Sequence, residues 1–252
     1  MTKRILITGD THRVFTHLLY YNNEPTIMII LGDACINYFC DGRDEEFKAS
    51  LCKKYNNITF FCLRGNHEQR PELCNIPIVE VNTEQVHGLF YHEDKYPNIY
   101  YFVDGTISYF DNFRCYAMGG AYSVDKYYRL AMGRQWFPQE QITIEEARDM
   151  RNVFEQSGEY FDFIFTHTCP FSWQPFDLFL EGLDQSTVDN GMEYFFQSLL
   201  YIEEEKGETR FGHWGYGHFH GNRWSPDKRG FMLSNKVVNI YDVAAGHLKE
   251  AE

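Results

Sequence analysis

Short apolar runs separated by stretches of helical length dominate the first part of the chain. Three of them, residues 3–8, 26–31 and 58–63, have the length and apolar content of buried β-strands. Residues 13–21 and 43–54 lie between these runs and can form helices, and apolar residues recur at helical spacing in the second of them. This alternation predicts parallel strands joined by right-handed crossovers, and therefore an α/β fold.

The middle of the chain carries shorter, aromatic-rich runs at residues 88–92, 99–103, 107–110 and 114–118. These indicate antiparallel strands that extend the first sheet or form a second one. Thr143 opens a predicted helix with capping-box spacing to Glu146, and a long amphipathic helix is predicted over residues 186–206. Further strands are expected at residues 161–166, 211–217 and 236–244. The chain shows no repeat, low-complexity tract or linker, so residues 1–252 are expected to form one domain.

Composition narrows the classes of partner. The net charge of −13 disfavours nucleic acid, because proteins bind nucleic acids largely by placing Lys and Arg on phosphates. The sequence shows no signal-peptide pattern and no apolar run long enough to span a bilayer, so a membrane is not expected as a partner. The seven cysteines are scattered, without CxxC spacing or a disulfide framework. We therefore expect a cytoplasmic protein.

Five polar clusters lie directly after, or at the end of, a predicted strand. They are Gly9-Asp10-Thr11-His12, Gly32-Asp33, Gly65-Asn66-His67-Glu68, His167 and Gly217-His218-Phe219-His220. In α/β sheets the loops at the carboxyl ends of the strands converge, and ligands bind there. The glycines allow sharp turns that bring the side chains together. Oxygen and imidazole groups without thiolates suit Mn, Fe or Zn better than Ca or a structural zinc.

Each cluster taken alone has an ordinary structural explanation. Asp10 could cap a following helix, and Gly32-Asp33 fits a common strand-to-helix turn. A single buried histidine such as His167 is often just hydrogen-bonded in a core. The conjunction of five clusters, in this order and each after a strand, is not explained in that way.

The order D-x-H, G-D, G-N-H-[DE], H, G-H-x-H covers residues 9 to 220 and resembles the signature of the calcineurin-like metallophosphoesterases. The resemblance implies a four-layer α/β/β/α sandwich of two mixed β-sheets with flanking helices. It also implies two metal ions, with Mn favoured and Fe or Zn as alternatives. One ion would be held by Asp10, His12, Asp33 and His220. Asp33 would bridge to the second ion, held by Asn66, His167 and His218.

The same resemblance implies a mechanism of phosphate-ester hydrolysis. The two ions would bind phosphate oxygens and activate a bridging water, so Asp33 would be catalytic as well as a ligand. His67 would not bind metal but would protonate the leaving oxygen, a task suited to a side chain that titrates near neutrality. Glu68 could orient His67, or could equally be a surface residue or a salt-bridge partner.

Residues 63–68, LRGNHE, are similar to a motif of the phosphoprotein phosphatases within this family. Those enzymes also carry GDxxDRG, in which the Asp supports the catalytic His and the Arg clamps the phosphate. Both residues are missing here, and Asn37 stands where the Arg would be, which argues against a protein Ser/Thr phosphatase. A phosphate clamp could come instead from Arg129 or Arg134 in residues 119–138, a segment that could equally be an irregular surface loop.

These features predict a metal-dependent hydrolase of phosphate esters, with a phosphomonoester of a small molecule or a phosphopeptide as the favoured substrate. A phosphodiesterase acting on a nucleotide or another diester is the alternative, because the missing Arg clamp suits a substrate with one less charge. A non-catalytic scaffold with this fold would have no need of a complete ligand set. A nuclease conflicts with the net charge of −13.

Overall fold

The computed structural model describes residues 3–179, 181–182 and 184–251. Its first part alternates strands and helices: β1 (Arg4–Thr8), η1 (Thr16–Tyr21), β2 (Thr26–Ile30), α1 (Gly42–Lys54), β3 (Ile58–Cys62) and η2 (Pro71–Cys74). A run of strands follows: β4 (Ile78–Asn82), β5 (Val86–His92), β6 (Ile99–Phe102), β7 (Thr106–Phe110) and β8 (Phe113–Met118). The next elements are α2 (Lys126–Ala131), α3 (Ile144–Gln156), β9 (Phe161–Thr166), η3 (Phe171–Trp173), η4 (Phe176–Leu178) and η5 (Gln185–Thr187). The last are α4 (Gly191–Lys206), β10 (Phe211–Tyr216), β11 (Arg223–Trp224), β12 (Gly230–Met232), β13 (Val238–Asn239) and α5 (Ile240–Ala244).

The strands form a mixed sheet. Their hydrogen-bonded order is β11-β12-β10-β9-β8-β7-β5-β6-β3-β2-β1-β13, and β4 pairs with β5. β1, β2 and β3 are parallel, as are β8, β9, β10 and β12, and the strands between them form antiparallel pairs. The predicted mixed α/β fold is therefore confirmed. The hydrogen bonds join the strands in one curled path, so a division into two separate sheets is not confirmed.

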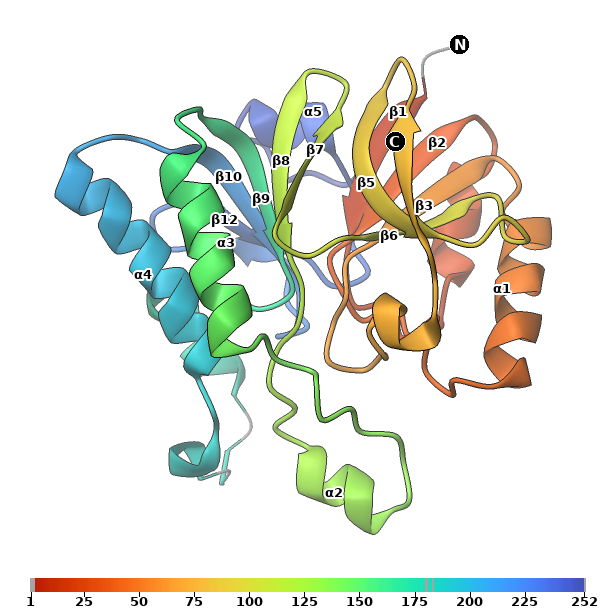
Figure 1. The fold of residues 1–252 in the computed structure, drawn as a ribbon, viewed down its shortest axis with the longest axis horizontal. Helices are drawn as coiled ribbons and strands as arrows, with labels where there is room; N and C mark the ends of the chain where they lie inside the picture. The colour runs from red at the N-terminus through yellow and green to blue at the C-terminus, as the bar shows by residue number, and fades with distance from the viewer. Residues whose placement is uncertain (1–2, 180, 183, 252) are drawn as a thin grey trace.

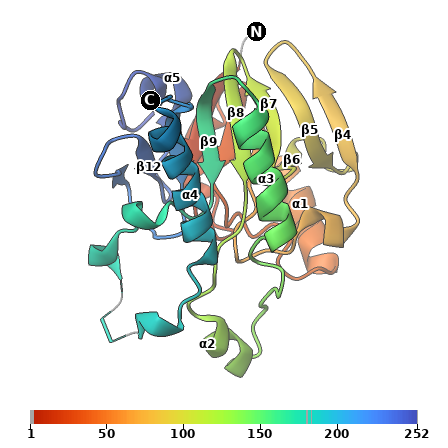
Figure 2. The same ribbon diagram turned by 60° about the vertical axis from the view of Figure 1, so that its left-hand side comes forward.

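Helices cover the two ends of this path. Figure 1 shows α3 and α4 outside the strands β8, β9 and β10, and α1 outside β1, β2 and β3. Figure 2 shows α3 and α4 running side by side. Apolar side chains from both groups of strands, among them Ile7, Ile29, Phe61 and Phe163, pack into one buried cluster between them. Two further clusters lie under α1 and under α3 and α4. The strand ends are thus held on a rigid core.

Several predicted element boundaries differ from the structure. The turn η1 replaces the helix expected over residues 13–21, and α4 begins at Gly191 because a short turn capped by Asp184 precedes it. The strand expected over residues 236–244 is wrong: β13 is short and α5 follows it. The side chain of Asn239 accepts a hydrogen bond from the Tyr241 N–H at 3.0 Å and so caps α5. The capping box of Thr143 and Glu146 is present as predicted.

Residues 119–138 form an excursion between β8 and α3. They contain the short helix α2, which projects away from the sheet in Figure 1. Among the helices in the described part of the chain, none has both the length and the apolarity needed to cross a membrane.

Candidate metal centre

The five polar clusters meet at one rim of the sheet. Asp10 and His12 follow β1, Asp33 follows β2, Asn66 and His67 follow β3, His167 follows β9, and His218 and His220 follow β10. Contacts of 2.9–3.8 Å between atoms of neighbouring members link these residues into one site. The structure therefore brings together the seven expected metal ligands and His67.

Strained backbone aims several of these side chains. Five non-glycine residues of the site have φ between 44° and 69°: His12, Asp10, Asp33, His220 and His218. Residues with a Cβ rarely adopt this left-handed conformation, which costs on the order of 1 kcal/mol each. Such strain persists only where the surrounding structure fixes it, and it is concentrated here at the rim where the loops meet.

Asp10, His12 and His220 form a first group of metal-binding type. The Nε2 atoms of His12 and His220 lie 3.0 Å apart. One carboxylate oxygen of Asp10 accepts a hydrogen bond from the His218 N–H at 3.0 Å, whereas its Oδ2 is buried and has no partner among the described residues. Ligand atoms of the three residues lie within 4.8 Å of one another. Two imidazole nitrogens beside a buried, unpaired carboxylate oxygen suit a divalent transition-metal ion.

Asn66, His167 and His218 form a second group. The Oδ1 atom of Asn66 lies 3.1 Å from both His167 Nε2 and His218 Nδ1. The Nδ1 of His167 donates to the Leu31 carbonyl at 2.8 Å, so Nε2 faces the site and offers its lone pair there once its proton is displaced. The amide nitrogen of Asn66 donates to Ser123 Oγ at 2.9 Å, and this bond holds Oδ1 toward the histidines.

Asp33 lies between the two groups. Its Oδ2 is 3.8 Å from His12 Nε2 and 3.3 Å from His167 Nε2, and its Oδ1 accepts a hydrogen bond from the His67 N–H at 2.9 Å. Burial alone would raise the pKa of Asp33, but the charges of His167 and His67 outweigh it and hold the pKa well below its usual range. One ionised carboxylate thus reaches both groups.

Two glycines allow this approach. A Cβ at Gly65 would lie 2.0 Å from Asp33 Oδ1 and 2.4 Å from the Asp33 nitrogen. Gly32 has φ +86°, and a Cβ there would lie 2.1 Å from His167 Nδ1. The loops therefore interlock at distances that only glycine permits.

His67 is turned into the same site, and its position depends on Arg129. His67 Nε2 lies 3.8 Å from Asp33 Oδ2, and its Nδ1 contacts the guanidinium of Arg129. Because a guanidinium can only donate hydrogen bonds, Nδ1 must accept. A neutral His67 therefore carries its proton on Nε2, the nitrogen that faces Asp33.

Arg129 and Arg134 lie in different surroundings. Arg129 is buried and is held by Asp125 at 3.0 Å and by the Gln135 carbonyl at 2.7 Å. The side chain of Arg134 is exposed and lies over the ring of Tyr128 at 5.4 Å. Within the described residues the structure brings only Arg129 of this pair into contact with the site.

Glu68 has neither of the roles considered from the sequence. It is buried, and its Oε1 accepts a hydrogen bond from the Gly65 N–H at 3.1 Å. Burial raises the pKa of Glu68 to about 7. Glu68 thus supports the turn that carries Asn66 and His67, rather than orienting the His67 ring or pairing at the surface.

Sequence reasoning missed the support behind Asn66. Ser123 Oγ donates to Glu140, whose carboxylate also accepts from the Ser123 N–H at 3.0 Å and from Trp136 Nε1 at 2.9 Å. Trp136 and Ser123 are 4 and 17 positions from Glu140, and Ser123 is 57 positions from Asn66, so no local motif links these partners to Asn66. In the sequence, the one feature that points to Ser123, Trp136 and Glu140 is that they lie in or next to the segment 119–138, which is a candidate substrate loop.

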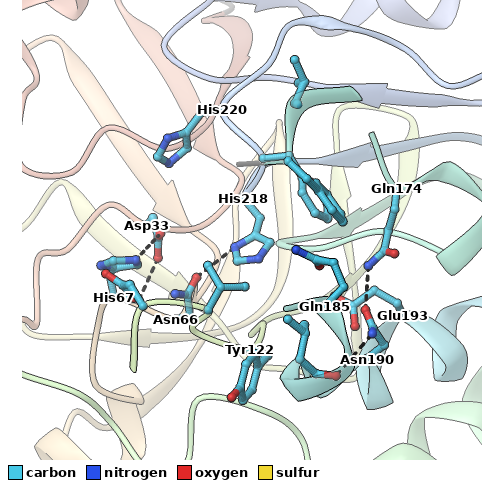
Figure 3. Close-up of a pocket in the computed structure, with 16 residues that line it drawn as sticks. Asp33, Asn66, His67, Tyr122, Gln174, Gln185, Asn190, Glu193, His218 and His220 are labelled. Carbon is cyan, nitrogen blue, oxygen red and sulfur yellow. Dashed lines mark hydrogen bonds and ion pairs between the residues drawn. The ribbon is translucent and has the colours of Figure 1, made fainter. Parts of the chain in front are cut away.

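A cavity of about 310 Å³ opens beside the metal-binding residues. Asp33, Asn66, His67, His218 and His220 line one end of it, and Gln174, Asn190 and Glu193 line the other (Figure 3). The volume lies in the range of small-molecule sites. A small organic ligand can therefore lie next to the candidate metal ions.

Oxygen and imidazole donors are gathered around one carboxylate, beside a cavity at the strand ends of an α/β sheet, and this arrangement is that of a candidate site for divalent metal ions. The family model for calcineurin-like phosphoesterases matches residues 3–222, so the chain belongs to this family of phosphoric ester hydrolases, which use a dinuclear metal centre. The family inferred from the sequence is thus confirmed. A comparison with curated proteins finds no match to the chain.

Replacing Gly65 by Ala tests the close approach of the loops. The added methyl group would push Asp33 out of position, so we expect metal affinity to fall by at least roughly 10- to 100-fold. Metal content after dialysis, measured by mass spectrometry, checks this. Gly42→Ala is the control, because a Cβ there meets nothing within 4 Å. Full metal content in the Gly65→Ala variant would show that the interlocking is not needed.

Metal binding should become tighter as pH rises. Burial raises the pKa of Asp10 to about 7. Burial lowers the pKa of His167, but the charge of Asp33 outweighs it and brings that pKa to about 9. Both groups hold protons near pH 7 that a cation must displace, so we expect metal binding to release about one or more protons there. Calorimetry in buffers with different ionisation enthalpies measures this number. Asp10→Asn should release about one proton fewer at pH 6, and a pH-independent affinity would contradict the assignment.

Proposed function

We propose that this protein is a phosphomonoesterase that acts on a small organic phosphate with the help of two divalent ions, of which Mn is favoured. The observation that carries the proposal is the convergence of two donor groups on Asp33 beside the cavity. One ion would be held by Asp10, His12, Asp33 and His220, and the other by Asp33, Asn66, His167 and His218. When bound, such a pair polarises a phosphoryl group and lowers the pKa of water for attack on phosphorus.

Residues of the chain would complete the chemistry. His67 Nε2 faces the site, and in this proposal its N–H donates a hydrogen bond to the leaving oxygen and stabilises the negative charge that develops there. Arg129 holds His67 in the tautomer that carries this proton and places a fixed positive charge next to it. Ser123 keeps the carbonyl of Asn66 directed at the second ion. Since His12, Asp33 and His67 also lie within 4.8 Å of one another, a metal-ligand role for His67 is the alternative to be tested.

Arg129 favours a monoester over a diester. The Arg of the phosphoprotein phosphatase motif is missing from the sequence after Asp33, and this absence had favoured a diester. The structure places the buried guanidinium of Arg129 against His67 from a different segment of the chain. The fixed positive charge of Arg129 behind His67 suits the extra negative charge of a monoester.

The activity is tested with p-nitrophenyl phosphate and bis-p-nitrophenyl phosphate. We expect chelation to abolish hydrolysis, Mn to restore it, and kcat/KM to be at least about 10-fold higher for the monoester. Asp33→Asn should lower activity by more than about 100-fold, and by more than His12→Ala, because it weakens both ion sites. Asp94→Asn, at an exposed position, is the control. A higher kcat/KM for the diester would show that the protein is a phosphodiesterase and not a phosphomonoesterase.

The role of His67 is tested by the leaving group. An alkoxide needs more stabilisation on leaving than nitrophenolate does, so loss of the His67 N–H in His67→Asn should cost little with p-nitrophenyl phosphate and up to roughly 10²–10³-fold with alkyl phosphates. Arg129→Ala should show the same dependence to a smaller degree, with unchanged metal content, because it frees the His67 ring. Arg134→Ala is the matched control and should leave both rates unchanged.

Equal losses of His67→Asn on both kinds of ester, together with the loss of one ion, would show that His67 is a metal ligand. Equal effects of Arg129→Ala and Arg134→Ala would show that Arg129 has no specific role in orienting His67.

A further inference from the structure

Glu193 is a buried carboxylate with an unsatisfied oxygen. It lies in the first turn of α4 and is 4% exposed. Its Oε1 accepts a hydrogen bond from Thr168 Oγ1 at 2.6 Å, whereas its Oε2 has no hydrogen-bond partner among the described residues. Buried polar atoms in native proteins are nearly always paired, so an oxygen of this kind calls for an explanation.

Glu193 lines the cavity at the end away from the metal-binding residues (Figure 3). Thr168, its partner, directly follows His167, so the carboxylate is tied to the same loop as a candidate metal ligand. Beside it, Gln174 Nε2 donates to Asn190 Oδ1 at 2.9 Å, and both amides also line the cavity. Burial raises the pKa of Glu193 to about 7, as expected for a carboxylate that lacks a compensating donor.

The walls between the two ends are apolar and partly flat. The rings of Phe179 and Phe219 are stacked with centroids 6.0 Å apart and an angle of 16° between their planes. Tyr122, Leu178 and Val188 line other parts of the wall. Among the described residues that line the cavity there is no Lys or Arg. A second anionic group of a substrate would therefore meet a carboxylate and no cation.

We propose that this end of the cavity binds the organic part of the substrate, and that this part is a flat ring carrying an amino or ring N–H group that donates to Glu193 Oε2. The ring packs on the apolar wall while its donor satisfies the buried oxygen. This inference rests on the proposed function and names its substrate class. A nucleobase and an arylamine share the required chemistry, whereas rings bearing a carboxylate or a second phosphate are excluded by repulsion.

Binding without turnover gives the first test. We compare the dissociation constants of 4-aminobenzylphosphonate and 4-methylbenzylphosphonate for the Mn-loaded full chain by calorimetry. The two compounds have nearly the same shape and differ in one donor group. We expect the amino compound to bind at least about 10-fold more tightly, because the methyl compound leaves Oε2 buried and unpaired. 4-Carboxybenzylphosphonate should bind more weakly than either. Equal affinities of the amino and methyl compounds would overturn the inference.

Glu193→Gln gives the second test. The replacement keeps the shape and removes the accepting carboxylate, so the preference for the amino compound should fall to about twofold or less. Affinity for the methyl compound should stay the same, which also shows that the variant is folded. Glu205→Gln, at an exposed position of the same helix, is the matched control and should keep the preference. An unchanged preference in Glu193→Gln would assign the selectivity to another group.

Turnover separates the two sources of such a ring. We compare adenosine 5′-monophosphate with purine riboside 5′-monophosphate, and 4-aminophenyl phosphate with 4-methylphenyl phosphate. A preference of at least about 10-fold in kcat/KM within the first pair supports a nucleobase, and within the second pair alone an arylamine. Absence of Mn-dependent hydrolysis of all four esters would refute the proposed function, while the phosphonate affinities would still decide the role of Glu193.

Discussion

The buried carboxylate of Asp33 is the interaction on which the rest of the site depends. It is 1% exposed, and nitrogens of His12, His67 and His167, which come from three different loops, lie within 3.8 Å of its Oδ2. The charge of His167, whose pKa is raised to about 9, compensates it. A buried charge is tolerated only when such partners are in place. The parallel strands bring these loops to one rim, and the glycines before Asp33 and Asn66 remove the side chains that would keep them apart. The strand arrangement and the glycines thus both act to bring these loops close to Asp33.

Much of this could be predicted because its signals are local in the sequence. The apolar runs that became β1, β2, β3, β9 and β10 are each followed within a few residues by a candidate metal ligand, so strand order alone places these side chains at one rim. The one failed strand, residues 236–244, has an apolar pattern that suits a strand as well as a helix. The cap formed by Asn239 decides between them, and the pattern does not show it.

The supporting contacts could not be predicted, because they join segments that are distant in the sequence. Arg129 meets His67 across 62 positions, Ser123 meets Asn66 across 57, and Glu193 meets Thr168 across 25. None of these pairs has a spacing that a helix or a strand would produce. They depend on how residues 119–140 and the start of α4 pack against the rim, which only the assembled fold determines. The sequence motifs therefore predict the candidate ligands of the site. The groups that orient these ligands can be found only from the tertiary structure.

The distribution of charge around the cavity links metal binding to substrate binding. Asp33, Asp125 and Glu193 line it, and Arg129, which pairs with Asp125, is not among the lining residues. A phosphate dianion entering this cavity would meet net negative charge in a partly desolvated space, where such repulsion is poorly screened. If two divalent ions bind at the rim as proposed, they would invert that local field, because their charges exceed those of the carboxylates beside them. In the proposed function, substrate affinity would therefore follow metal occupancy, and the end of the cavity without a lining cation would select an uncharged or basic organic group.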